Sequence, residues 1–253
     1  MKAIRSALVT GGARRIGRAI VEDLAAYGFA VAIHAHGSDR EAETLAAALG
    51  RRGATAVVLK ADLTRLDETE GLIDAAREAI GSLGLLINNA SLFKDDSASE
   101  FDAANWDAHF AVHARAPVVL AQRFAAQRPE DAGALVVNII DQRVWRLTPK
   151  FFSYTLSKAT LWTATQTLAQ GLAPHVRVNA IGPGPTLANE RQSAADFEAQ
   201  AAKIPLGRGP ELSEFGRTIR YLVETPSITG QMIALDGGQH LAWQTPDNTD
   251  IGE

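Results

Sequence analysis

Seven short apolar segments recur along the chain, and longer amphipathic stretches separate them. Each of these segments is four to six residues long, and most are rich in Val, Ile and Leu. Such runs are typical of strands that are buried on both faces of a parallel sheet. Their alternation with helical stretches predicts an α/β fold, with a doubly wound parallel sheet of about seven strands and helices on both faces. The expected strands are Ala7–Thr10, Ala30–His34, Ala56–Lys60, Leu85–Asn88, Leu135–Ile139, Val176–Ile181 and Met232–Leu235.

Three of the intervening stretches carry clear helix signals. Ile16–Tyr27 opens after a glycine-containing turn, and Phe151–Leu172 is a long helical stretch that stops before a proline. Ser38–Glu41 has the spacing of a capping box, which predicts the start of a helix that runs to about Arg52. These stretches supply the helical layers of the predicted fold.

No Pro-, Gly- or Ser-rich linker divides the chain, so residues 1–243 are predicted to form a single domain. Residues 244–253 are polar and acidic, a composition typical of a disordered tail. The stretch from Thr186 to about Lys203 is polar, rich in alanine and without a strand pattern. We expect it to be a mobile segment over the C-terminal end of the sheet.

Composition excludes several classes of function. The 253 residues carry a formal net charge of −4, which gives no general attraction for nucleic acid or anionic membranes. The absence of cysteine excludes disulfides and thiolate metal sites, and no metal site is predicted. The N-terminal residues lack the long apolar stretch of a signal peptide, and no later segment has the about 18 uninterrupted apolar residues of a membrane span, so we expect neither. We therefore expect a cytoplasmic protein whose partner is a small molecule.

A glycine-containing turn, Thr10–Gly17, joins the first strand to the first helix. Glycines let the backbone turn tightly and approach a pyrophosphate, while the helix N-terminus offers N–H groups and its positive dipole end. A turn with a purely structural role is the alternative, but the position between strand and helix favours dinucleotide binding. The predicted cofactor-binding residues here are Gly11, Arg14, Arg15, Ile16 and Gly17.

The end of the second strand predicts which dinucleotide binds. An acidic residue at this point would accept hydrogen bonds from the ribose of NAD, and the chain has none there. Asp39 lies too far along the chain to be this ribose-binding acid. The polar and basic groups present suit the 2′-phosphate of NADP, although Ser38 could serve only as a helix cap. The residues concerned are His34, His36 and Ser38, with Arg40, Arg14 and Arg15 nearby.

Tyr154 and Lys158 lie four residues apart, on one face of the long predicted helix. Two surface side chains would have the same spacing by chance. In the chemical interpretation, the lysine ammonium lowers the pKa of the phenol. The tyrosine can then donate and accept a proton near neutral pH.

Taken in chain order, these motifs resemble the short-chain dehydrogenase/reductase family over about residues 4–243. The resemblance also rests on Asp62, Asn88–Ala90, Asn179–Gly184 and Asp236–Gly238. It implies a Rossmann-type fold, an NADP-dependent oxidoreductase and a homotetramer with interfaces at the last strand, Phe110–Phe124 and Phe151–Leu172. It implies further cofactor contacts at the adenine, the two riboses and the nicotinamide, from Asp62, Leu63, Asn89, Ala90, Ser91, Tyr154, Lys158, Pro183 and Gly184.

Three positions depart from the common pattern of that family. Arg15 stands at the middle glycine of the turn, and His113 stands at a helix position usually held by a catalytic Asn. Asp141, thirteen residues before the tyrosine, replaces the catalytic serine. Arg15 and Asp141, with Phe93 after the fourth strand, resemble the pteridine reductase branch. There the arginine lies near the cofactor phosphate and the substrate, and the aromatic ring stacks on the pterin.

Two further features are similar to dihydromonapterin reductase, namely His113 and the pair Asn189 and Glu190. A lone histidine on a helix is also common as a structural residue. Phe93 has a comparable alternative, because a phenylalanine at this position could belong to the core.

The aspartate favours a nitrogen heterocycle as substrate. A serine can donate a hydrogen bond to a carbonyl that is gaining negative charge, whereas an ionised Asp141 would repel that charge. An aspartate suits a ring that bears N–H donors, or can itself carry a proton beside Tyr154. Phe93 offers a flat face for stacking.

The sequence therefore predicts NADPH-dependent reduction of a 7,8-dihydropterin, of the dihydromonapterin, dihydrobiopterin or dihydrofolate type, to the tetrahydropterin. Asp141, Tyr154 and Lys158 are the predicted catalytic residues, and Arg15 and Phe93 join Asp141 and Tyr154 in binding substrate. The last proton donor is Tyr154 or a water held by Arg15. The alternatives are a carbonyl or sugar reductase, which Asp141 disfavours, and an NADPH-binding regulatory protein, which the Tyr154/Lys158 pair disfavours.

Overall fold

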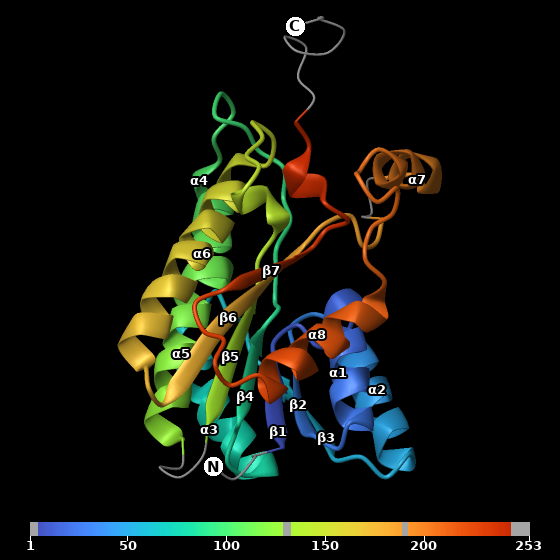
Figure 1. The fold of residues 1–253 in the computed structure, drawn as a ribbon. Helices are drawn as coiled ribbons and strands as arrows, with labels where there is room; N and C mark the ends of the chain where they lie inside the picture. The colour runs from blue at the N-terminus through green and yellow to red at the C-terminus, as the bar shows by residue number, and fades with distance from the viewer. Residues whose placement is uncertain (1–4, 129–132, 189–191, 244–253) are drawn as a thin grey trace, which may run out of the picture.

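The computed structural model describes residues 5–128, 133–188 and 192–243 and contains one seven-stranded sheet. Every neighbouring pair of strands is parallel, and the order is β3-β2-β1-β4-β5-β6-β7 (Figure 1). The predicted parallel sheet is confirmed. Its strands are β1 Ser6–Val9, β2 Ala30–Ala35, β3 Ala56–Lys60, β4 Leu85–Asn88, β5 Ala134–Ile139, β6 Val176–Pro183 and β7 Met232–Leu235.

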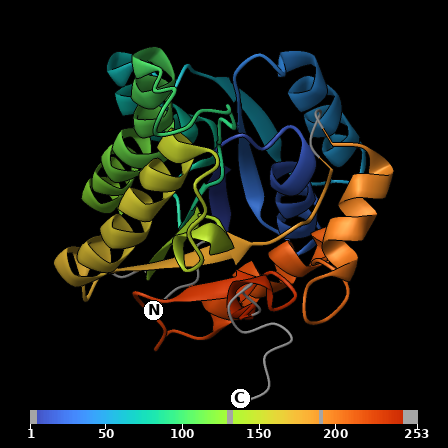
Figure 2. The same cartoon turned by 90° about the horizontal axis from the view of Figure 1, so that it is seen from above.

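Helices cover both faces of this sheet, as the doubly wound prediction requires (Figure 2). One face packs against α1 Arg15–Ala26, α2 Asp39–Arg51 and α8 Leu212–Glu224. The other packs against α3 Leu66–Ile80, α5 Ala116–Gln127 and α6 Phe152–Leu172. The remaining helical elements are α4 Ala103–Phe110, α7 Ala194–Ala202, the π-helical turn η1 Ala111–Arg115 and the 3₁₀ turns η2 Gln142–Val144 and η3 Gln239–Leu241.

The central strand β1 shows why apolar runs without alternation form this sheet. Ala7 and Val9 belong to the core beneath α1 and α2, whereas Leu8 belongs to the core on the opposite face. All three side chains are fully buried. Because successive strand residues point to opposite faces, a strand covered on both sides needs apolar residues at every position.

The predicted helices begin within one residue of the expected positions, but one predicted capping interaction is absent. Helix α2 begins at Asp39 as expected, but the Ser38 side chain makes no capping hydrogen bond. The two acidic residues of the first turn instead form ion pairs, Asp39 with Lys60 and Glu41 with Arg14. The predicted capping box is therefore wrong: the backbone of Ser38, with φ of −132° and ψ of 38°, is not extended as an N-cap requires, and Glu41 is paired with Arg14.

The described part of the stretch from Thr186 to Lys203, for which the sequence showed no strand pattern, is helical over several residues. It contains helix α7, and the Ser193 hydroxyl caps that helix by accepting a hydrogen bond from the Asp196 N–H at 3.1 Å. Asn189, Glu190 and the tail at 244–253 lie outside the described residues. The division into a domain of residues 1–243 and a tail stays a prediction.

The parallel strands all end at the same edge of the sheet, so the segments that follow β1, β4, β5 and β6 meet there (Figure 1). In an open α/β sheet this edge is where ligands bind. Within the described part of the chain, no helix has the length and apolar character of a membrane span. Nor does that part contain a cluster of three or more His, Asp or Glu side chains suited to a metal ion.

Candidate active site

A cavity of about 860 Å³ opens at the C-terminal edge of the sheet. It extends from the turn after β1, past the end of β2, to the segments after β4, β5 and β6 and to helix α6. Every residue that the sequence predicted to bind cofactor or substrate lines this cavity. Residues that are distant in sequence are thus assembled into one site by the parallel sheet.

The turn after β1 has the shape of a phosphate cradle. A Cβ atom on Gly17 would lie 2.2 Å from the Gly11 carbonyl oxygen and 2.5 Å from Asn89 Nδ2, so glycine is required there. Asn89 Nδ2 donates to the carbonyl oxygens of Thr10 and Gly11 and holds the turn against the end of β4. Helix α1 has neither a side-chain cap nor an acidic residue in its first turn. Its N-terminus therefore suits the pyrophosphate of a dinucleotide.

Arg15 adopts the left-handed backbone conformation, with φ of 52°. Glycine takes this conformation with little strain, whereas residues with a side chain rarely adopt it. The Arg15 guanidinium donates to the carbonyl oxygens of Leu187 at 3.1 Å and Ala188 at 2.9 Å. It thereby ties the cofactor turn to the segment that follows β6.

His34 lies at the cavity wall but uses both ring nitrogens within the protein. Its Nδ1 accepts the Gly11 N–H at 3.1 Å, so Nε2 carries the proton and bonds to the Ala61 carbonyl oxygen at 2.9 Å. Burial lowers the pKa of this histidine. The neutral ring supports the turn and, in this structure, presents no spare donor to a phosphate.

The rim near the end of β2 carries groups that suit a 2′-phosphate. His36 and Ser38 line the cavity, and the Ser38 hydroxyl is not used as a helix cap. Arg14 lines it too, with its guanidinium paired to Glu41. Asp39 is paired with Lys60 at 3.3 Å, and neither it nor Arg40 is among the residues that line the cavity.

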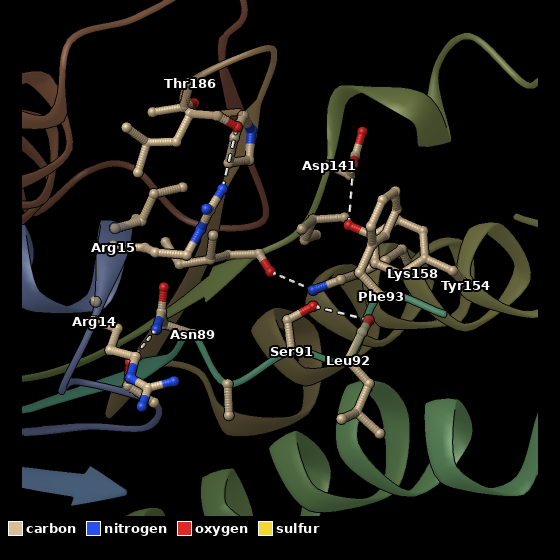
Figure 3. A pocket seen from close by; sticks show the side chains of 18 of the residues that line it. Arg14, Arg15, Asn89, Ser91, Leu92, Phe93, Asp141, Tyr154, Lys158 and Thr186 are labelled. Carbon is tan, nitrogen blue, oxygen red and sulfur yellow. Dashed lines mark hydrogen bonds between the residues drawn. The ribbon is translucent and has the colours of Figure 1, made fainter. Parts of the chain in front are cut away.

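Asp141 and Tyr154 face each other in the inner part of the cavity (Figure 3). Asp141 follows β5, and its Oδ2 accepts a hydrogen bond from the Tyr154 hydroxyl at 2.9 Å. Its Oδ1 accepts the Arg143 N–H at 2.8 Å and caps η2. The carboxylate is thus held in a fixed orientation toward the phenol.

Lys158 is buried one helical turn after Tyr154. Its Nζ donates to the Ile139 carbonyl oxygen at 2.9 Å and lies 5.8 Å from the centre of the Tyr154 ring. Burial lowers the pKa of Lys158 to about 8, and the negative charge of Asp141 opposes that fall. The lysine therefore titrates close to neutral pH.

The pKa of Tyr154 moves in the direction opposite to the sequence-based expectation. Burial raises it well above 10, and the charge and hydrogen bond of Asp141 add to the rise. The expectation that Lys158 makes this phenol more acidic is therefore wrong, because burial and Asp141 dominate. Tyr154 keeps its proton at neutral pH, which suits a proton donor.

Phe93 lines the cavity beside the phenol. Its ring stacks on Phe151 with centres 4.3 Å apart and meets the edge of Tyr154 at 4.8 Å. The side chain is half-buried and takes no part in the two main cores. This position suits contact with a flat ligand better than ordinary core packing.

His113 links the segment after β4 to helix α6. Its Nε2 accepts the Leu92 N–H at 3.0 Å, so Nδ1 carries the proton and donates to Ser157 Oγ at 2.8 Å. Ser157 in turn donates to the Tyr154 carbonyl oxygen. Burial, with the nearby Lys158 charge, lowers the pKa of His113 well below 6.5. The neutral ring is a positioning residue that fixes Tyr154 and the backbone next to Phe93.

Sequence reasoning missed Arg143, which also lines the cavity. Its side chain approaches the rings of Phe93, Phe151 and Tyr154. The available signal was its place two residues after Asp141, because residues that follow a parallel strand at its C-terminal end commonly reach the ligand site.

Comparisons with known proteins agree with the family resemblance found in the sequence. The sequence model of the short chain dehydrogenase family matches residues 5–199. The 3-oxoacyl-(acyl-carrier-protein) reductase FabG of Staphylococcus aureus is 28% identical over 246 residues, which cover 95% of this chain and all of the relative. A short-chain type dehydrogenase/reductase of Picea abies is 28% identical over 249 residues, 93% of this chain and 92% of the relative.

Solved structures include more similar chains. FolM alternative dihydrofolate reductase 1 from Brucella canis, complexed with NADP, is 60% identical with a TM-score of 0.94, covering 96% of this chain and 97% of that one. The Brucella suis protein, also in complex with NADP, is 61% identical with the same TM-score and coverage. A blue fluorescent protein from a metagenomic library, in complex with NADPH, is 27% identical with a TM-score of 0.86, covering 93% and 97% of the two chains.

Proposed function

This chain belongs to the short-chain dehydrogenase/reductase family, and we propose that it is an NADPH-dependent reductase of dihydropterins. The observation that carries the proposal is the Asp141 carboxylate bonded to the Tyr154 hydroxyl, at the position for which the family resemblance implies a serine. The two FolM dihydrofolate reductases at 60% and 61% identity support the same substrate class.

The cofactor is NADPH, and the residues present fit it. The uncapped N-terminus of α1 and the glycine cradle suit its pyrophosphate, and the cavity continues from there to Lys158 and Gly184. Lys158 would hold the nicotinamide ribose, with Pro183 and Gly184 beside the nicotinamide. When bound, NADPH supplies the hydride that reduces the substrate.

Tyr154 is the proton donor in this mechanism. Its hydroxyl gives a proton to N5 of the 7,8-dihydropterin as C6 accepts the hydride, so the C6=N5 double bond becomes a single bond. The products are the tetrahydropterin and NADP⁺. Asp141 orients the phenol, and with Lys158 it returns a proton from solvent to the tyrosinate. The Arg15 guanidinium is bonded to two backbone carbonyls, which favours Tyr154 over a water held by Arg15.

A turnover assay tests this function directly. The purified protein would be given NADPH with dihydromonapterin, dihydrobiopterin or dihydrofolate, and in parallel with a panel of ketones, aldehydes and sugars. We expect oxidation of NADPH with the dihydropterins and little with the carbonyl compounds. Preferential turnover of carbonyl compounds would indicate a carbonyl or sugar reductase, and tight NADPH binding without turnover would indicate a regulatory protein.

NADPH is expected to bind at least ~10-fold more tightly than NADH, because each charge-assisted contact to the 2′-phosphate contributes on the order of 1.5–3 kcal/mol. Binding titrations of both cofactors measure the preference. Arg14→Met and Ser38→Ala should each reduce it. Arg40→Met, at a nearby arginine outside the cavity lining, is the matched control and should leave it unchanged. Equal affinities for the two cofactors in the wild type would contradict the prediction.

The kcat/KM for NADPH is expected to fall as pH rises above about 8, the pKa to which burial lowers Lys158. Below this pH the ammonium is charged and can donate strongly to the ribose. Above it the neutral amine is a weaker donor. The pH profile of kcat/KM reports groups of the free enzyme and measures this value. A profile that stays flat to pH 10 would contradict the role of Lys158. The Lys158→Met enzyme should lack the fall in kcat/KM above about pH 8.

The reductase is further proposed to act in the cytoplasm as a homotetramer, with β7, α5 and α6 at the interfaces. This part of the proposal follows from the family resemblance. Sedimentation of the purified protein measures the assembly, and a monomer at working concentration would contradict it.

A further inference from the structure

Arg143 is a cationic side chain that the mechanism above does not use. It lies in η2, two residues after Asp141, and lines the cavity. Its Nε and Nη1 atoms are buried and have no hydrogen-bond partner among the described residues. Asp141 accepts the backbone N–H of Arg143 and directs its other oxygen to Tyr154, so it does not satisfy the guanidinium.

Three aromatic rings surround this guanidinium. Its Cζ atom lies 5.1 Å from the centre of the Phe151 ring and 5.8 Å from the centres of the Phe93 and Tyr154 rings. Cation–π attraction therefore holds the side chain at the wall where a flat ligand would stack. The rings do not replace hydrogen bonds, and buried donors without partners are rare and costly. Donors in this state at a cavity wall indicate that a ligand supplies the acceptor.

We propose that Arg143 is a substrate contact that donates hydrogen bonds to the carbonyl oxygen at C4 of the pterin ring. The inference rests on the proposed function. On a pterin, the C4 carbonyl and N5 are neighbours on one edge of the bicyclic ring. A substrate that presents N5 to the Tyr154 hydroxyl therefore turns its C4 oxygen toward the same side of the cavity, where Arg143 lies.

The same position gives Arg143 a second effect on the reaction. Hydride transfer to C6 pushes electron density onto N5, and a cation beside N5 and the C4 oxygen stabilises that charge before the proton arrives. Burial and Asp141 raise the pKa of Tyr154, and the positive charge of Arg143 opposes this rise. Arg143 thus compensates, on the substrate side, for the negative charge that Asp141 brings to the site.

The test compares three variants with the wild type, namely Arg143→Met, Arg143→Lys and the control Arg146→Met. Arg146 is an exposed arginine of the same loop and is not among the residues that line the cavity. Each protein would be assayed with dihydromonapterin, whose side chain is neutral, and with dihydrofolate, whose glutamate tail is anionic. NADPH affinity and melting temperature would be measured alongside.

We expect Arg143→Met to lower kcat/KM about 100-fold for both substrates, the scale of losing one preorganised donor in a buried site. Arg143→Lys keeps the charge and should recover part of the loss. Arg146→Met should behave as the wild type, and NADPH affinity should be unchanged in all three variants. A purely structural arginine would instead lower the melting temperature and NADPH affinity together with turnover.

Three outcomes would overturn the inference while leaving the proposed function in place. The first is near wild-type turnover in Arg143→Met. The second is a loss of turnover confined to dihydrofolate, which would assign Arg143 to the glutamate tail. The third is a loss of turnover that unfolding explains in both Arg143 variants. A wild-type enzyme that reduces neither substrate would overturn the proposed function itself, and the inference with it. The two failures are therefore distinguishable.

Discussion

Tyr154→Phe is expected to lower kcat for dihydropterin reduction by roughly 10²- to 10⁴-fold, the usual contribution of a positioned general acid. The substitution keeps the ring that packs against Phe93 and removes only the hydroxyl. That hydroxyl is bonded to Asp141 at 2.9 Å and keeps its proton at neutral pH, since burial and Asp141 raise its pKa. NADPH binding should change little, because Lys158 and the turn after β1 are untouched.

Steady-state kinetics and a NADPH titration on the same preparation measure both effects. Tyr221→Phe is the matched control, because Tyr221 is an exposed tyrosine on α8 and is not among the residues that line the cavity. It should keep full activity. A Tyr154→Phe enzyme that retained most of its turnover would move the proton-transfer role to a water held by Arg15, and Arg15→Met would then be the variant that stops the reaction.

Asp141→Ser is expected to lower turnover of dihydropterin by about 10²-fold or more, on the scale of losing one well-placed polar group in a buried site. The substitution removes the carboxylate that orients the Tyr154 hydroxyl and that can accept hydrogen bonds from ring N–H groups. The fold should survive, because serine is also a good N-cap for the η2 turn that Asp141 now caps. NADPH affinity should stay nearly unchanged, since Asp141 faces the substrate side.

A comparison of both enzymes on dihydropterin and on a ketone panel tests this prediction. The wild type should be poor toward simple ketones and aldehydes, and Asp107→Ser, at an exposed aspartate of α4, should match the wild type on every substrate. Efficient ketone reduction by the wild type, together with near wild-type dihydropterin turnover by Asp141→Ser, would mean that Asp141 does not select the substrate. The protein would then belong with the general carbonyl reductases.

The fold was predictable because its determinants are local in the sequence. In β1 the three residues at positions 7–9 are all apolar, and such a run is typical of a strand covered on both faces. Gly17 is also required for a local reason, because a side chain there would collide with the turn that precedes it. The observed ends of the elements differ from the predicted ones by one or two residues. Strand β6, for example, continues to Pro183. The Ser38 cap failed because the backbone of Ser38, with φ of −132° and ψ of 38°, is outside the extended conformation that an N-cap side chain needs to reach the first turn.

The membership of the site was predictable for a related reason. Parallel strands end at one edge, so residues that follow strands in the sequence, such as Asp141 and Asn89, must meet in space. The four-residue spacing of Tyr154 and Lys158 likewise follows from helical geometry alone. Sequence order and regular secondary structure together define which groups share the cavity.

Only the tertiary structure decided what state those groups are in. The pKa of Tyr154 is set by burial and by Asp141, and the sequence does not encode the depth of burial at a given residue. His34 supports the turn because both its nitrogens find partners on other segments, Gly11 and Ala61. Arg143 stands out because two of its buried nitrogens have no partner among the described residues. Solvation and hydrogen-bond partners depend on which distant segments pack together, so they emerge only with the folded chain.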